Sequence, residues 1–158
     1  MFAKKIKGFS LVEILVVIGI IGLILTFLVV ALNLKQQSIR DTKRVSDIQT
    51  LRNALEVMKN ETGGYDQSLC GLTFVRACGQ QENSALIKIM PGIKSLADPK
   101  FQNLSCANAT ACQGGGCDYG FTKIEPADYE VRFYLERGVD DYQFPGCYRA
   151  SPQGIFKL

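Results

Sequence analysis

The chain has 158 residues, about one ordinary domain, and its composition excludes several classes of protein. It contains no histidine, so it lacks the most usual general base and the most common metal ligand, which argues against an enzyme. Lysine and arginine total 18 against 15 acids, but Lys4, Lys5 and Lys7 precede the first long element, and the remainder is electrically neutral. A neutral body lacks the clustered cations of nucleic-acid binding, so no nucleic-acid partner is predicted.

The first long element is an apolar run from Phe9 to Leu34. Its clearly polar residues are Ser10, Glu13, Thr26 and Asn33. As a helix with a rise of about 1.5 Å per residue, the run would measure roughly 39 Å, enough to cross a bilayer with some tilt. A cleaved secretory signal has a shorter apolar core, of about 7 to 15 residues, followed by a small-residue site that this run lacks. The run and its lysines therefore fit a single-pass anchor with a cytoplasmic amino terminus.

A simple anchor does not explain Glu13. A carboxylate at the centre of a membrane helix costs about 2.5 to 3.5 kcal/mol, and less near an interface. Glu13 follows Phe9 by one helical turn and lies on the same face of the helix. A cut before Phe9 would create an α-amine one turn from this acid, and the two groups would attract strongly in a medium of low dielectric.

The stretch Lys7-Gly8-Phe9-Ser10-Leu11-Val12-Glu13, followed by an apolar run, resembles the prepilin signature of the type IV pilin superfamily. That family includes pilins and the pseudopilins of type II secretion and competence systems. The resemblance implies a leader, residues 1–8, which a prepilin peptidase removes by cutting after Gly8. It also implies N-methylation of Phe9 and a role for Glu13 in filament assembly.

The chain departs from the family in one respect. Many members break the hydrophobic helix with a proline where this chain has Val29, Val30 and Ala31, so the backbone here is not forced to unwind. Gly19 and Gly22 lower the helix propensity of the run. They leave open either local melting or close helix packing, and glycine is also simply common in membrane helices.

The helical pattern continues after the apolar run. Apolar residues recur at steps of three and four and form a stripe made of Val45, Ile48, Leu51, Leu55 and Met58. Gly63 and Gly64 then supply a stop signal. We expect one helix with an assembly half at residues 9–34 and an amphipathic half at residues 35–62. The alternative is two helices with a hinge near Asn33.

A dense run of charges lies near the start of the amphipathic half. It consists of Arg40, Asp41, Lys43 and Arg44. We interpret it as a solvated helix face just outside the bilayer, to which subunit contacts could be added.

Six cysteines lie in the remaining region, residues 63–158, which we call the head. They are Cys70, Cys78, Cys106, Cys112, Cys117 and Cys147. Their spacing contains no CxxC pair, so disulfides formed in an oxidising compartment fit better than a zinc site. Loop length favours pairing Cys70 with Cys78, Cys106 with Cys112, and Cys117 with Cys147, although the sequence cannot choose among the many pairings. The glycine triplet at 114–116 lacks a following GK[ST] and is predicted to be a turn.

The end of the chain has the pattern of a sheet. Apolar and polar residues alternate from Tyr129 to Glu136, which predicts a half-buried strand. Two further short strands are predicted at 146–150 and 155–158, with a turn between them at 151–154. Packing an antiparallel sheet on the helix stripe would bury both apolar faces, which predicts an α+β fold. The pilin resemblance implies the same layout, with a disulfide-tied loop region.

Two acids in the head, Asp140 and Asp141, are weak candidates for calcium binding. Carboxylates in an extracellular loop can hold calcium, and the resemblance implies the option because major pseudopilins commonly do so near their carboxyl ends. No EF-hand spacing is present, so solvated turn residues are the favoured interpretation. Apart from this calcium option, no cofactor is expected.

These features predict a structural subunit of an extracellular, type IV pilus-like filament. The precursor would lie in the lipid of the cytoplasmic membrane, meet the prepilin peptidase there, and join a homo-oligomeric filament at the cell surface through an inner-membrane assembly platform. One alternative is a pseudopilin of a type II secretion or DNA-uptake system. The other is a membrane-anchored adhesin that never polymerises.

Overall fold

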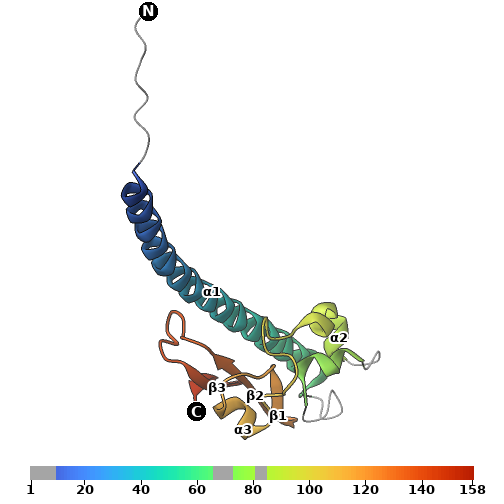
Figure 1. Cartoon of the computed structure of the whole chain (residues 1–158). Helices are drawn as coiled ribbons and strands as arrows, with labels where there is room; N and C mark the ends of the chain where they lie inside the picture. Colours follow the sequence, from blue (N-terminus) through green and yellow to red (C-terminus); the bar gives the residue numbers. More distant parts are fainter. Residues whose placement is uncertain (1–9, 66–72, 81–84) are drawn as a thin grey trace, which may run out of the picture. The chain divides into compact units, whose positions relative to one another are not determined.

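The structure, a computed structural model, describes residues 10–65, 73–80 and 85–158. Its helices are α1 (Leu11–Thr62), the 3-10 helix η1 (Val75–Gln80), α2 (Ala85–Ile89), the 3-10 helix η2 (Pro91–Ser95) and α3 (Ala109–Gln113) (Figure 1). Its strands are β1 (Gly120–Glu125), β2 (Asp128–Leu135), β3 (Gly146–Ser151) and β4 (Gly154–Lys157). The chain divides into two compact units, residues 1–36 and 37–158.

Helix α1 is continuous over 52 residues, and neither Gly19 nor Gly22 interrupts it. It also continues through Asn33, so the single predicted helix is present. The helix ends where Gly63 adopts a φ of 83° and donates its N–H to the Lys59 carbonyl at 2.8 Å. This left-handed glycine is the predicted stop signal, because a residue without a Cβ takes positive φ at little cost.

The four strands form one antiparallel sheet in the order β1-β2-β3-β4. The predicted strands correspond to β2, β3 and β4, within about two residues at each end, as boundaries commonly vary. The first strand, β1, was not predicted. Its register against β2 shifts between Phe121 and Lys123, and such a bulge breaks the alternation of faces that identifies a strand in sequence.

The core of the second unit lies between the sheet and the second half of α1. On the helix, Ile48, Leu51, Leu55 and Met58 are almost completely buried, as the stripe predicts. On β2, alternate residues are buried, and these are Tyr129, Val131, Phe133 and Leu135. Both sets belong to one apolar cluster, so the helix and the sheet cover each other's apolar faces.

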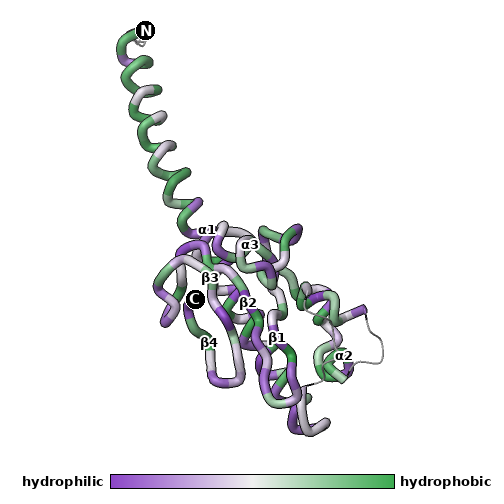
Figure 2. Tube along the Cα trace, turned by 90° about the horizontal axis from the view of Figure 1, so that it is seen from below, coloured by the Kyte–Doolittle hydropathy of each residue, from purple (hydrophilic) through white to green (hydrophobic). Residues whose placement is uncertain are grey.

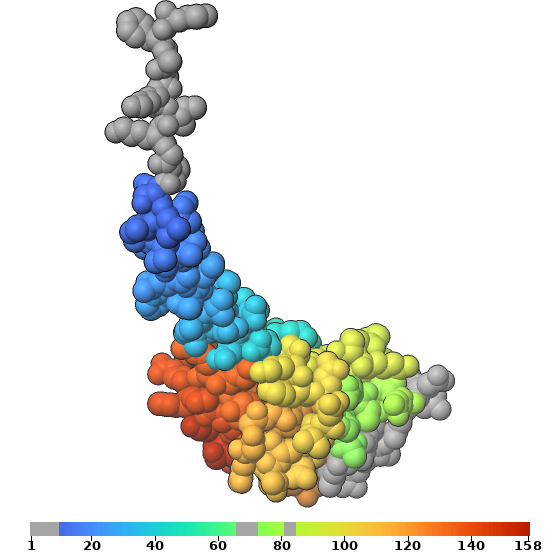
Figure 3. All heavy atoms as spheres, in the orientation of Figure 1, coloured from blue at the N-terminus to red at the C-terminus, as the bar shows by residue number. Residues whose placement is uncertain are grey.

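The segment between α1 and the sheet completes this core. Val75 on η1, Leu86 on α2 and Ile93 on η2 are fully buried and join the same cluster. In the space-filling view, the strands (orange to red) and the segment before them (yellow) form one closely packed surface (Figure 3). The α+β fold predicted from the sequence is therefore confirmed for the described residues.

Candidate functional site

The first half of α1 is apolar on every side and has no partner among the described residues. All positions from Ser10 to Gln36 are exposed, and the tube coloured by hydropathy is mostly green along this stretch (Figure 2). Within the described residues, α1 is the one helix long and apolar enough to cross a membrane, and the apolar window that meets this test has no buried residue. A helix that is hydrophobic all round needs a covering of lipid or protein from outside its own chain.

Glu13 is the only ionisable residue between Leu11 and Leu34. It lies in the first turn of α1, where its backbone N–H donates to the Ser10 carbonyl at 3.0 Å. A carboxylate is favoured in a first turn, because the helix dipole presents positive charge there. The hydroxyl of Thr26 donates to the Leu23 carbonyl at 2.7 Å and is thus satisfied within the helix. Glu13 is therefore the one charged group of this segment, and it has no counter-charge among the described residues.

A second group of interest is a buried cluster of charges that joins α1 to the head. The guanidinium of Arg44 is fully buried and donates from Nε and Nη2 to both oxygens of Asp98, at 2.6 and 2.9 Å. Its Nη1 donates to Asp41 and to Glu136, each at 2.8 Å. One arginine thus holds three carboxylates, which come from α1, from the segment before the sheet and from the residue that follows β2.

Asp41 and Glu136 extend the cluster. Asp41 is fully buried, and its two oxygens accept the backbone N–H groups of residues 136–138 at 2.8 to 2.9 Å. Arg40 makes a two-pronged contact with Glu136, with both distances 2.7 Å. Burial alone would raise the pKa of the Glu136 carboxyl, but the hydrogen bonds from Arg40 and Arg44 outweigh it and lower that pKa to about 2.

The prediction of a solvated charge run was therefore wrong for Asp41 and Arg44, both fully buried. The physical reason is that these two positions continue the buried stripe of α1 upward from Val45 at helical spacing. Their charges are tolerated there because Asp98 and Glu136 supply matching partners. The sequence signal for this burial was the helical spacing of Asp41 and Arg44, which puts them on the same face as the apolar stripe.

The comparisons with known proteins concern the amino-terminal segment. The family model of the prokaryotic N-terminal methylation motif matches residues 3–29. The chain carries the prepilin-type cleavage and methylation signature of type IV pilin-like proteins. The matched range includes Gly8, Phe9 and Glu13, of which Gly8 and Phe9 lie outside the described residues. The comparisons with curated proteins and with solved structures gave no match.

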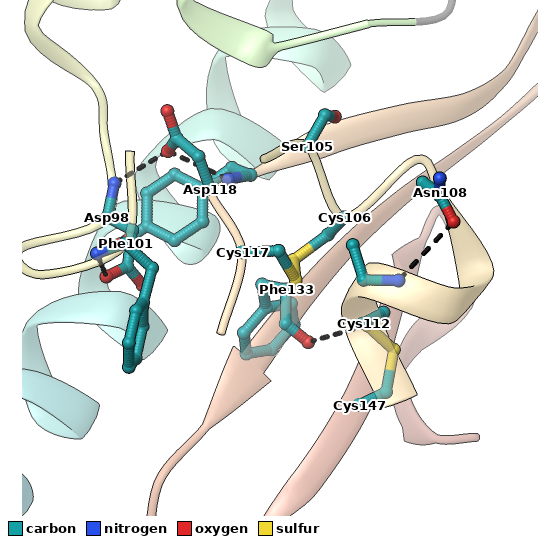
Figure 4. The surroundings of a disulfide bond; sticks show 12 residues. Asp98, Phe101, Ser105, Cys106, Asn108, Cys112, Cys117, Asp118, Phe133 and Cys147 are labelled. Carbon is teal, nitrogen blue, oxygen red and sulfur yellow. Dashed lines mark hydrogen bonds between the residues drawn. A yellow bond between two sulfur atoms is a disulfide. The ribbon is translucent and has the colours of Figure 1, made fainter. Parts of the chain in front are cut away.

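Two disulfides join pairs of described cysteines in the head, and their pairing differs from the predicted one. The structure joins Cys106 to Cys117 and Cys112 to Cys147 (Figure 4). The expected bonds Cys106–Cys112 and Cys117–Cys147 are therefore wrong. Cys78 is also disulfide-bonded, whereas Cys70, its predicted partner, lies outside the described residues.

Backbone pairing explains the observed bonds. Cys106 donates its N–H to the Asp118 carbonyl at 2.8 Å, and Asp118 donates to the Leu104 carbonyl at 2.7 Å. This parallel bridge brings the Cα atoms of Cys106 and Cys117 to 5.0 Å. Helix α3 then carries Cys112 to β3, where its Cα lies 5.5 Å from that of Cys147. Short separation in sequence was thus a poor guide to distance in the fold.

The two calcium candidates and the glycine triplet lie at turns. Asp140 and Asp141 form the tip of a tight turn, in which Val139 and Tyr142 exchange backbone hydrogen bonds of 2.9 Å. Among the described residues, one group of three metal-ligand side chains is close enough to share an ion, and it consists of disulfide-bonded cysteines rather than these acids. The glycine triplet is a turn, as predicted, with Gly115 at a φ of 89°.

Proposed function

We propose that the chain is a structural subunit of an extracellular, type IV pilus-like filament. The observation that carries this proposal is the prepilin-type motif at residues 3–29, which leads directly into a helix that is apolar on every side. Lipid covers this helix in the precursor. In the filament, the helices of other subunits cover it, and the heads lie outside.

Cleavage by the prepilin peptidase prepares the subunit for assembly. The cut after Gly8 removes the leader, residues 1–8, and frees the α-amine of Phe9, which is then methylated. In the filament this amine neutralises Glu13 of a neighbouring subunit. An ammonium group and a carboxylate attract strongly when water is excluded, and a misplaced subunit leaves Glu13 unpaired. Glu13 therefore sets the register of each subunit as it leaves the membrane through the assembly platform.

The disulfides of the head favour the role of a pilus subunit over that of a pseudopilin, whose filament is shorter. A disulfide-tied region, from Cys106 to Cys117, is held to strand β3 through Cys112 and Cys147. Such covalent ties suit a surface displayed outside the cell, where the compartment is oxidising. Electron microscopy of sheared surface material separates the two roles, because a pilus gives long filaments and a pseudopilin gives none that extend from the cell.

The direct test replaces Glu13 with alanine in the full chain, expressed with its own assembly machinery. We expect Glu13→Ala to insert and to be cleaved normally but to give at least about tenfold less sheared filament, which corresponds to about 1.4 kcal/mol. Glu61→Ala is the matched control, because Glu61 is an exposed acid at the other end of the same helix. A normal filament yield from Glu13→Ala would contradict the proposal.

A further inference from the structure

The face of the sheet that is turned away from the core carries two arginines side by side. On β2 the residues that alternate with the buried ones lie on this outer face, and Arg132 is one of them. Its partner in the register of β3 is Arg149, directly opposite, so the two side chains share the face. Like charges at directly opposite positions destabilise a sheet. A local arrangement that costs stability and is nevertheless present indicates a functional site.

A single acid, Glu130, offsets these two cations. Its Oε1 accepts a hydrogen bond from Nε of Arg132 at 2.9 Å, and its Oε2 lies 3.6 Å from Nη1 of Arg149. Among the described residues, no other carboxylate lies within 4.0 Å of either guanidinium, and the Nη atoms of Arg132 have no hydrogen-bond partner. The side chains of Arg132 and Arg149 are 24% and 46% exposed. The pair therefore keeps a net positive charge and unused donors that a ligand in solvent can reach.

A small cavity extends this positive region. It has a volume of about 230 Å³, and its polar side chains are those of Gln113, Arg132 and Lys157. The rest of its lining is small or apolar and consists of Ala109, Gly146, Cys147 and Leu158. The disulfide between Cys112 and Cys147 fixes α3, and with it Gln113, to β3. The wall of the cavity is thus held covalently, which is the preorganisation that a binding site needs.

The ammonium group of Lys157 supplies a third cation. It lies 5.1 Å from the centre of the Phe144 ring and makes no ion pair within the described part of the chain. Gly146, at a φ of 138°, gives the lysine room, since a Cβ there would lie 3.3 Å from Cε of Lys157. Contact with a ring directs an ammonium group and leaves its N–H donors available. Three cations against one acid, Glu130, leave an excess of two positive charges.

The excess charge and the donors together select the ligand. A carboxylate carries one negative charge, and so does each phosphodiester of a nucleic acid. A phosphate monoester carries about −1.5 to −2 at pH 7 and offers three strong acceptor oxygens. Its charge matches the excess, and arginine and lysine are ordinary phosphate-binding residues. The amide of Gln113 both donates and accepts hydrogen bonds, which suits the hydroxyl groups of a sugar attached to the phosphate.

We propose that Arg132, Arg149, Lys157 and Gln113 form a basic site that binds a phosphate monoester, such as the phosphate group of a phosphorylated sugar. All four residues belong to the head. The proposal therefore does not depend on cleavage after Gly8, on methylation or on filament assembly, and it adds a ligand to a chain whose proposed role is structural.

Titration calorimetry of the full chain in detergent tests the basic site with inorganic phosphate and with glucose 6-phosphate. We expect each to bind saturably, one per chain, with a dissociation constant below about 10 mM. Dimethyl phosphate and glucuronate carry one negative charge each and should bind at least about fivefold more weakly. The absence of saturable binding of both phosphate monoesters would overturn the proposal. Equal affinity for all four compounds would also overturn it, because an unselective positive surface does not distinguish these groups.

Lys157→Gln and Lys88→Gln are a matched pair of variants, because both lysines are exposed and only Lys157 lines the cavity. Lys157→Gln should weaken the binding of glucose 6-phosphate at least about fivefold, whereas Lys88→Gln should bind it as the wild type does. Both variants should keep the denaturant midpoint of the wild type, since neither lysine makes an ion pair among the described residues. Equal affinities of the two variants would overturn the assignment of the site.

Arg132 tests the geometry of the site as well as its charge. Arg132→Gln should weaken the binding of glucose 6-phosphate about tenfold or more, because bonds between arginine and phosphate are charge-assisted and often two-pronged. Arg132→Lys should restore only part of the affinity, since a lysine returns the charge without the planar fork. Wild-type affinity in Arg132→Gln would contradict the proposal.

Discussion

The two halves of α1 share one backbone conformation and differ in where their apolar side chains find a partner. Before Gln36 every described residue is exposed and Glu13 is the only acid. From Val45 to Met58 most apolar residues lie on one face and are buried in the core that the helix shares with the sheet, whereas Ile39 and Val57 are exposed. The second half therefore folds against its own chain, whereas the first half requires lipid or other subunits. Changes in the first half should act on processing and assembly, and changes in the second half on stability.

The largest expected effect is the loss of processing in Gly8→Val. The prepilin resemblance implies a leader that ends in glycine, so we expect every chain of the variant to keep its leader while the unfolding of the second unit is unchanged. Mass spectrometry of the amino-terminal peptide measures this. Gly22→Val is the control, because a Cβ at Gly22 meets no atom within 4 Å. Cleavage of Gly8→Val at the wild-type position would break the assignment of the cut.

Arg44→Met should have the opposite pattern, a loss of stability with normal processing. It leaves Asp41 and Asp98 buried without their counter-charge, which should lower the free energy of unfolding by about 3 to 5 kcal/mol. Cleavage after Gly8 should be unaffected. Denaturant unfolding of the full chain in detergent, followed by near-ultraviolet circular dichroism of its tyrosines, measures the loss.

Lys43→Met is the control for this variant. The Lys43 side chain is 53% exposed, and its removal should cost less than about 1 kcal/mol. Equal stabilities of the two variants would show that the buried cluster does not hold α1 to the head.

The disulfides should contribute somewhat less. Replacing Cys112 and Cys147 by serine opens a separation of 35 residues, and replacing Cys106 and Cys117 opens one of 11. Chain entropy predicts losses of about 4 and about 3 kcal/mol. Counting free thiols in a double variant tests which cysteines are paired. Cys106→Ser combined with Cys112→Ser should expose two free thiols, at Cys117 and Cys147, and finding none would restore the pairing expected from loop length.

The smallest expected effect is the pH dependence contributed by Glu136. Its pKa is lowered from 4.5 to about 2 in the folded chain, so its stabilisation is complete above pH 4.5 and is lost as the pH falls toward 2. We expect the wild type to lose about 1 to 3 kcal/mol more than Glu136→Gln over this range. Unfolding curves at several pH values give the free energy of unfolding of both proteins. The same pH dependence in wild type and Glu136→Gln would argue that the cluster does not cause the loss of stability at low pH.

Local patterns in the sequence predicted much of this fold. The period of α1, its stop at Gly63 and the alternation of β2 all depend on neighbouring residues. Strand β1 escaped prediction because its bulge breaks the alternation.

Long-range partners could not be predicted in the same way. The burial of Arg44 depends on Asp98 and Glu136, which lie 54 and 92 residues away in sequence. The Cys106–Cys117 bond depends on a bridge between two backbone segments, and the Cys112–Cys147 bond on the position of α3 beside β3, and no spacing rule reveals either. Gly8, Phe9 and Glu13 could be singled out in the sequence because the motif that contains them is itself a local pattern.

The mass of the amino-terminal peptide from sheared surface material tests the filament proposal most directly. The peptide should begin at Phe9 and carry one methyl group on its α-amine, and the same material should contain filaments. A peptide that still begins at the leader, from chains present at the cell surface, would contradict both the cleavage and the assembly.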